Sequence, residues 1–221
     1  MIEYIVTNNI DDRSLAKAAH ILLNGGLVAL PTDTSWSIVC SLKSPTGIKN
    51  LRKLSGERNE RHFTLLCSAI SQFSDLCSLD NSRFRLVKRL SPGPYVFILK
   101  TLLGTEKALD IRRPEAGVRI PNHPVPIALI YTLQHPLYSI TAKKSMHKDI
   151  EFEETASETD TELPPIPEED LFEGGWELED ISGLDLVLDD SEERERIFST
   201  ILDLTGDEIK LLRKGAGEWP V

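Results

Sequence analysis

The chain has 221 residues, 40% of them hydrophobic, which is enough to bury a substantial core. No apolar run approaches the ~18 residues of a membrane-spanning helix. The formal net charge of −10 is uneven, since residues 1–148 hold 20 Lys and Arg against 11 Asp and Glu, whereas residues 149–195 hold one Arg against 20 acids. The front of the chain therefore suits anionic ligands, and the acidic block would be a poor surface for nucleic acid.

The first two-thirds of the chain predicts strands that alternate with helices. A helix is expected at Asp12–Leu23, because Asp11 or Asp12 can cap its first turn and Gly25-Gly26 can end it. Two more helices are expected from Ser44-Pro45 to Leu54 and from Asp80 to Leu90, and a third at Pro124–Gln134. The expected strands are Glu3–Thr7, Leu27–Leu30, Phe63–Cys67, Tyr95–Lys100, Gly117–Ile120 and Tyr138–Thr141.

The last third begins with an acidic stretch. From Lys148 to Pro167 the chain has few apolar residues, many acids and several prolines. We expect residues 149–167 to form a mobile acidic insertion within one domain that spans 1–221, since so little apolar surface cannot offset the entropy of ordering. Strands are expected afterwards at Leu184–Leu188, Phe198–Leu204 and Glu208–Arg213, the last two as a hairpin. Strands that alternate with helices, together with hairpins, predict a layered α/β fold with a mixed sheet.

The cysteines and the first residues bear on the cellular location. Cys40, Cys67 and Cys77 form no CxxC pair, and Glu3 is followed by no basic segment that leads into an apolar run. We therefore expect free thiols, no zinc site, no secretory signal and a cytoplasmic protein.

A short polar motif, Thr32-Asp33-Thr34, follows Pro31 at the end of a buried strand. Ligands of open α/β sheets lie beyond the carboxyl ends of strands, so two hydroxyls and a carboxylate at this point can bind a polar ligand. The same side chains can instead tie off a turn. The residues alone leave both interpretations open.

A basic stretch, Arg52–His62, contains four cations and one histidine around a predicted helix end. Cations at a helix C-terminus are favoured by the helix dipole, which is one explanation of the pattern. The other is a phosphate clamp, in which Lys53 supplies a point charge and Arg58 and Arg61 supply bidentate hydrogen bonds. The pattern does not decide between them.

Three later constellations also carry polar groups at or near strands. Arg119 lies inside a predicted buried strand, where an unpaired charge is costly, so it needs an acidic partner or an anionic ligand. The other two are Thr141 with Lys143 after one strand, and Ser199-Thr200 facing Arg213 across the hairpin. The sequence has no Walker A, GxGxxG or HExxH motif, and no metal site is predicted.

Taken in chain order, these pieces resemble the YrdC/YciO family, whose best-known members are threonylcarbamoyl-adenylate synthases. The resemblance rests on LVALPTDTSWSIVC, the basic loop followed by FTLLC, SPGPYVFILK, GVRIPNHP, HPLYSITAKKS and STILDLTGDEIKLLRKGAGE. It covers about residues 10–145 and 197–217 and is nearer to the YciO branch. It implies a twisted, mixed open sheet with helices packed on it and a positively charged cleft.

The resemblance also implies a chemistry. Family synthases make an adenylate from ATP, bicarbonate and threonine with release of pyrophosphate, and the product serves the modification of adenosine in transfer RNA. The implied cofactor is Mg²⁺ with ATP. The implied partners are ATP or AMP, threonine and bicarbonate, with transfer RNA or double-stranded RNA in some members, and no membrane. The resemblance assigns no residue a catalytic role. The residues that it assigns to nucleotide or substrate binding are Thr32, Asp33, Thr34, Lys53, Arg58, Arg61, Arg119, Thr141, Lys143, Ser199, Thr200 and Arg213.

The sequence departs from the synthase pattern at three places. The Lys-x-Arg of the basic loop aligns with Ser55-Gly56-Glu57 or, with a shift, with Lys53 and Arg58. The Ser-x-Asn after the later strand aligns with Thr141-Ala142-Lys143, and the Val-Tyr-Gly that usually follows PTDT is Ser35-Trp36-Ser37. Two hypotheses follow: a weakly active synthase-like enzyme that uses ATP, or a non-catalytic protein that binds nucleotide or double-stranded RNA. The basic stretch Arg83–Arg89, with Phe84, suits RNA, although solvated helix faces carry such residues as well.

Overall fold

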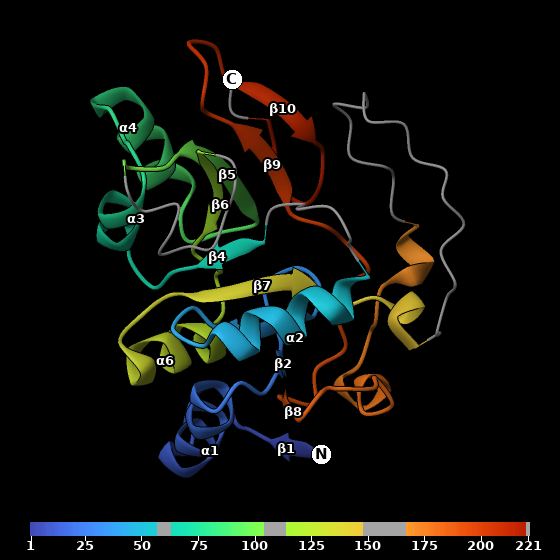
Figure 1. The fold of residues 1–221 in the computed structure, drawn as a ribbon. Coiled ribbons are helices and arrows are strands. Elements are labelled where there is room, and N and C mark those ends of the chain that lie inside the picture. The colour runs from blue at the N-terminus through green and yellow to red at the C-terminus, as the bar shows by residue number, and fades with distance from the viewer. Residues whose placement is uncertain (57–62, 104–113, 148–166, 220–221) are drawn as a thin grey trace.

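The computed structural model describes residues 1–56, 63–103, 114–147 and 167–219. Their strands form one sheet, and helices pack on both of its faces (Figure 1). The strands are β1 (Ile2–Tyr4), β2 (Val28–Leu30), β3 (Ser37–Ser41), β4 (Thr64–Leu66), β5 (Tyr95–Lys100), β6 (Glu115–Arg119), β7 (Leu137–Thr141), β8 (Leu186–Asp189), β9 (Thr200–Asp203) and β10 (Lys210–Arg213). The α-helices are α1 (Asp12–Leu23), α2 (Pro45–Ser55), α3 (Ile70–Leu76), α4 (Asn81–Leu90) and α6 (Pro124–Leu133), and 3-10 helices lie at Lys144–His147, Glu168–Asp170 and Gly175–Leu178.

The ten strands follow the order β1-β8-β2-β3-β7-β4-β6-β5-β9-β10. Neighbours run parallel in the pairs β1–β8, β8–β2, β4–β6 and β5–β9, and antiparallel in the other pairs. β8 lies between β1 and β2, whereas β9 and β10 complete the opposite edge. Figure 1 shows β1 and β10 at opposite ends of the molecule, close to the N- and C-termini. The predicted α/β fold with a mixed open sheet is confirmed.

Local hydrogen bonds explain where three of the helices begin. The side chains of Asp11, Ser44 and Asp80 each accept a first-turn N–H, at the starts of α1, α2 and α4. Beyond the end of α1, Gly25 has φ of 91°, a left-handed conformation that glycine adopts without strain. The helix starts are therefore those that the capping residues predict.

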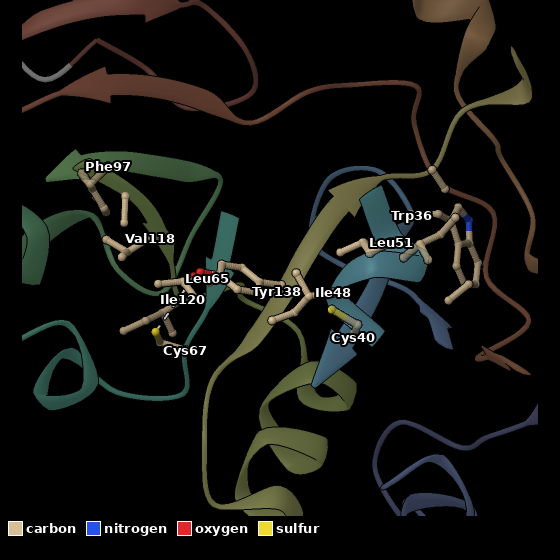
Figure 2. Packing of buried hydrophobic residues seen from close by; sticks show 14 of the residues in the cluster. Trp36, Cys40, Ile48, Leu51, Leu65, Cys67, Phe97, Val118, Ile120 and Tyr138 are labelled. Atoms are coloured by element: carbon tan, nitrogen blue, oxygen red, sulfur yellow. Dashed lines mark hydrogen bonds between the residues drawn. The ribbon is translucent and has the colours of Figure 1, made fainter. Parts of the chain in front are cut away.

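The apolar side chains of the sheet alternate between two faces, because successive residues of a strand point to opposite sides. On one face Val28, Leu30 and Val39 pack against α1 and α6. On the other face Ala29 and Ile38 belong to a larger core that α2, α3 and α4 cover. Figure 2 shows part of this larger core, in which the labelled side chains are Trp36, Cys40, Ile48, Leu51, Leu65, Cys67, Phe97, Val118, Ile120 and Tyr138.

Besides the three 3-10 helices, the structure contains one strand and one α-helix that the sequence does not predict. β3 is buried at every residue, yet it begins and ends with serine and therefore lacks a clear apolar pattern. α3 has seven residues, of which Phe73 alone is buried, so it is too short for a helical period to emerge.

Part of the predicted organisation lies beyond the described residues. The expected acidic insertion at 149–167 falls outside them apart from Pro167, so the single domain and its mobile insertion stay predictions. In the ranges that the structure describes, no helix is long and apolar enough to cross a membrane.

Candidate functional site

One face of the sheet carries a band of polar residues across four strands. Residues directly opposite one another in neighbouring strands share a face, and the register pairs Ser37 with Thr141, Ser139 with Thr64, and Thr64 with Gly117. These residues lie on the face that α1 and α6 cover elsewhere. Val39 and Leu66, two positions after Ser37 and Thr64, point to the same side of the sheet and belong to the core beneath these two helices. We call Ser37, Thr64, Gly117, Arg119, Ser139 and Thr141 the polar face.

The hydroxyls of this polar face are not all engaged. Ser139 Oγ donates to the carbonyl oxygen of Thr64 at 3.0 Å. The hydroxyls of Ser37, Thr64 and Thr141 make no hydrogen bond with any residue that the structure describes. Three hydroxyls on one face are therefore available to a polar ligand.

Arg119 is the centre of a buried cluster at one end of the polar face. It is 4% exposed, and its Nη2 donates to Asp33 Oδ1 at 2.6 Å. Its Nη1 donates to Ser199 Oγ at 2.6 Å and to Thr34 Oγ1 at 3.1 Å, and its Nε donates to the Gly93 carbonyl at 3.3 Å. The acidic partner that the buried arginine requires is therefore Asp33, and the same guanidinium fixes two hydroxyls.

A second arginine converges on Ser199 from the hairpin. Arg213 Nε and Nη2 donate to the Ser199 carbonyl at 3.2 and 3.0 Å, and the guanidinium lies 4.8 Å from the Phe198 ring centroid. Burial, with a further contribution from the charge of Arg119, lowers the pKa of Arg213 to about 10. Its Nη1 has no hydrogen-bond partner among the described residues. We call Asp33, Thr34, Arg119, Ser199 and Arg213 the Arg119 cluster.

The charges of the Arg119 cluster do not balance. Burial lowers the pKa of Arg119, and Asp33 opposes this shift, whereas no described carboxylate opposes the shift of Arg213. Asp33 therefore pairs with Arg119, whereas Arg213 has no carboxylate partner among the described residues, and Oδ2 of Asp33 is buried without a hydrogen-bond partner there. A half-buried cationic group with free donor capacity is a suitable site for an anion.

A protein-family model for Sua5, YciO and YrdC proteins, described as "Telomere recombination", matches residues 20–165. The chain belongs to this Sua5/YciO/YrdC family. It is 28% identical over 216 residues to YciO of Escherichia coli, which is 97% of this chain and 95% of that protein. The crystal structure of E. coli YciO matches with a TM-score of 0.76 and covers 99% of this chain and 97% of YciO.

Two other members of the family have more informative names. A threonylcarbamoyl-AMP synthase of Klebsiella pneumoniae is 27% identical over 140 residues, which is 62% of this chain and 74% of the synthase. P. abyssi Sua5, solved in complex with L-threonine, matches 97% of this chain at 22% identity with a TM-score of 0.76, and the match spans 57% of Sua5. The family resemblance of the sequence is confirmed, and the Sua5 structure supports the fold.

The remaining site residues that the family resemblance assigns lie in different surroundings. The Thr32 hydroxyl donates to the Ser35 carbonyl at 2.7 Å, which supports the turn interpretation of its motif. The Thr200 hydroxyl donates to the Gly217 carbonyl at 2.6 Å and is fully buried, so it anchors the chain after β10.

The cations assigned to phosphate binding are spread over several segments. Lys53 is exposed near the end of α2 and has no ion pair among the described residues. Arg58 and Arg61 lie outside the described residues. Thr141 ends β7 on the polar face, and Lys143 is half-buried and pairs through its backbone with Leu171.

A pocket of about 520 Å³ opens near the ends of β4 and β6, and none of the predicted site residues lines it. Its lining residues are Ser68, Ala69, Ile70, Ser91, Pro92, Ile120, Pro121, Asn122, His123, Pro124 and Ile127.

Sequence reasoning missed three groups near the Arg119 cluster. The hydroxyls of Ser37 and Thr64 become site candidates only through strand alternation and register. Arg194, whose Nε donates to the Thr32 carbonyl at 3.1 Å, comes from the acidic block of residues 149–195, for which the sequence predicts no site. Its position as a lone cation among 20 acids is the one signal that the sequence offers.

Proposed function

We propose that this Sua5/YciO/YrdC protein binds ATP and a small carboxylate ligand at the Arg119 cluster and the polar face, and has the reaction class of a threonylcarbamoyl-AMP synthase. The observation that carries the proposal is the pair of guanidinium groups that converge on Ser199, of which only Arg119 has a carboxylate partner among the described residues. The name of the Klebsiella relative and the threonine bound to Sua5 support the ligand chemistry. The protein would then act in the cytoplasm and serve transfer-RNA modification.

The two ends of the site suit different parts of the substrates. The buried end, with the hydroxyls of Thr34 and Ser199 fixed by Arg119, suits a small carboxylate such as that of threonine. The end at Arg213, with its free Nη1, suits phosphate groups, and Lys53 is a further candidate cation for them. In the proposed reaction the amine of threonine joins bicarbonate with loss of water to give a carbamate, whose oxygen then attacks the α-phosphate of ATP and displaces pyrophosphate. Fixed cations would stabilise the charge that develops on the leaving pyrophosphate.

Magnesium enters the proposal as the companion of the ATP phosphates. Mg²⁺ is usually held by substrate phosphates, waters and one or two carboxylates. In the described part of the chain no group of three or more His, Cys, Asp or Glu side chains could hold a metal ion. The donor set of the Arg119 cluster therefore fits a metal that arrives with its nucleotide, for which Asp33 would be the carboxylate ligand.

The proposal includes low activity, because the residues after β7 differ from the synthase pattern. Lys143 places a cation where synthases have an amide, which suits anion binding but not the orientation of threonine. A small misplacement of the reacting groups can cost about a hundredfold in rate. The test is incubation with ATP, Mg²⁺, bicarbonate and threonine, followed by detection of pyrophosphate and of the adenylate by mass spectrometry. The double variant Thr141→Ser/Lys143→Asn is expected to release more pyrophosphate.

Reactions that lack one substrate provide the controls. Pyrophosphate that forms equally well without threonine or bicarbonate would argue for plain ATP hydrolysis. Absence of ATP and AMP binding at millimolar concentration, measured by calorimetry, would remove the proposal altogether.

A second candidate function, non-catalytic RNA binding, is favoured by α4. Arg85, Lys88 and Arg89 are exposed on this helix and make no ion pair within the described residues, and the neighbouring Phe84 is 39% exposed. Phosphate contacts would make such binding fall steeply with added salt. Titration of labelled double-stranded RNA at several salt concentrations tests it, and the variant Arg85→Glu/Lys88→Glu should then abolish binding.

A further inference from the structure

A second buried ionic cluster consists of His123, Asp190 and Arg194. The Asp190 side chain is fully buried, and the side chains of Arg194 and His123 are 8% and 11% exposed. Arg194 Nη1 and Nη2 donate to Asp190 Oδ1 and Oδ2 at 2.9 and 2.5 Å. The charges of these two residues cancel, so this cluster needs no anion, and its role depends on what it holds in place.

His123 connects this ionic cluster to the first turn of α6. Its Nδ1 accepts the N–H of Val125 at 3.3 Å, which requires the ring proton on Nε2. Nε2 then donates to Asp190 Oδ2 at 3.1 Å. Arg194 Nη2 lies 3.0 Å from the same ring nitrogen, and both nitrogens direct a proton to Asp190 Oδ2. The imidazole therefore performs two separable tasks, a helix cap through one nitrogen and a link to Asp190 through the other.

Arg194 holds the loop between β2 and β3 at two points. Its Nε donates to the Thr32 carbonyl at 3.1 Å, and its guanidinium lies 4.9 Å from the centroid of the Trp36 ring. The loop between these points carries Asp33 and Thr34, which contact Arg119. The bidentate pairing with Asp190 fixes the orientation of this guanidinium.

The two clusters join the same three segments of the chain. The β2–β3 loop contributes Thr34 to one cluster and the Thr32 carbonyl to the other. The end of β6 contributes Arg119 to the first cluster and the connection that follows it contributes His123 to the second. The β8–β9 connection contributes Ser199 and Arg194 in the same way. β2 and β3 are separated in the sheet from β6 and β9 by other strands. Contacts outside the sheet must therefore set the position of the loop relative to Arg119.

We propose that His123, Asp190 and Arg194 are positioning residues that hold Thr32–Thr34 against Arg119 and so keep the ligand site assembled. The effect on ligands rests on the proposed function, whereas the effect on the loop does not. Loss of the His123–Asp190 link should loosen the loop even where the fold is fully stable.

Two variants of His123 separate positioning from general stability. In His123→Asn the carboxamide oxygen can replace Nδ1 as the cap, but the side chain is too short to reach Asp190. In His123→Gln the longer amide can reach Asp190, but the cap is lost. His123→Gln is expected to lower Tm by about 2–4 °C, and His123→Asn to leave Tm nearly unchanged.

Hydrogen exchange of residues 31–36 in the ligand-free protein is the decisive measurement. The Thr34 N–H donates to Thr32 Oγ1 at 3.1 Å and provides a protected reporter. We expect about tenfold faster exchange in His123→Asn and in Arg194→Met, and wild-type exchange in His123→Gln. Arg196 lies on the same β8–β9 connection as Arg194 and forms an ion pair with Glu173. Arg196→Met is therefore the matched control, and its exchange should equal that of the wild type.

Calorimetry with ATP and threonine tests the consequence for ligands. The affinity for ATP and threonine should fall about tenfold in His123→Asn and stay at the wild-type level in His123→Gln. This order of the two variants is the reverse of their order in Tm. Exchange that follows Tm instead, fastest in His123→Gln, would overturn the positioning role. If the wild type binds neither ligand, the proposed function fails, and the exchange result still decides whether the loop is positioned in this way.

Discussion

Removal of Arg119 while Asp33 remains should destabilise the protein strongly. Arg119 is the hydrogen-bond partner of Asp33 Oδ1, and Oδ2 is buried without a partner among the described residues. Arg119→Met would therefore leave a carboxylate with 13% of its side chain exposed and no opposing charge. Breaking a buried ion pair at one side typically costs about 3–5 kcal/mol, and we expect the free energy of unfolding to fall by that amount.

The same reasoning predicts a rescue by a second substitution. Asp33→Asn added to Arg119→Met removes the stranded charge, and the double variant should recover about 2 kcal/mol or more relative to the single one. Urea unfolding at pH 7, followed by circular dichroism, measures the unfolding midpoints of the single and the double variant. A loss below about 1 kcal/mol in Arg119→Met, or a double variant no more stable than the single one, would refute the ion-pair explanation.

Three further outcomes are expected. Arg213→Gln should weaken ATP and AMP binding by about 1.5–3 kcal/mol in calorimetry, as loss of a charge-assisted hydrogen bond predicts, and unchanged affinity would contradict this. Burial raises the pKa of Asp190, but hydrogen bonds from its two partners outweigh burial and hold the pKa far below its usual range. The contribution of Asp190 to stability is therefore present above a pH of about 4 and is lost as the pH falls further. In Asp190→Asn the urea concentration at the unfolding midpoint should depend less on pH in this acidic range than it does in the wild type. Gly215→Ala should lower Tm, because a Cβ would lie 2.2 Å from the Phe198 carbonyl, whereas Gly206→Ala, with its nearest atom at 3.9 Å, should not.

The sequence predicts best what local chemistry determines. The caps at Asp11, Ser44 and Asp80 depend on contacts within one turn, so the starts of three helices follow directly. The hairpin of β9 and β10 also depends on neighbouring residues, and its antiparallel pairing is confirmed.

The partners within the site could not be predicted in the same way. The sequence shows that Arg119 needs an acidic group or an anion, but the partner Asp33 lies 86 positions away. Arg194 and the Thr32 carbonyl are 162 positions apart. Such contacts follow from strand order and register, which a single sequence does not reveal. The family resemblance supplied the candidates, and the structure distinguishes among them. Thr200 anchors the backbone near the C-terminus, whereas Ser199 lies between two arginines.

The place of β8 in the sheet also bears on how the protein is made. β1 and β2 each pair with β8 and not with each other, so a growing chain has no strand to fill this gap until residues 186–189 have been synthesised. β1 therefore cannot pair until a strand near the end of the chain has been made, and contacts between residues so far apart in the sequence slow folding. Until then, β1 and one edge of β2 present unpaired backbone groups. During translation the N-terminal edge of the sheet therefore stays open, and a ribosome stalled before residue 186 would hold a chain in which β1 and β2 lack the strand that joins them.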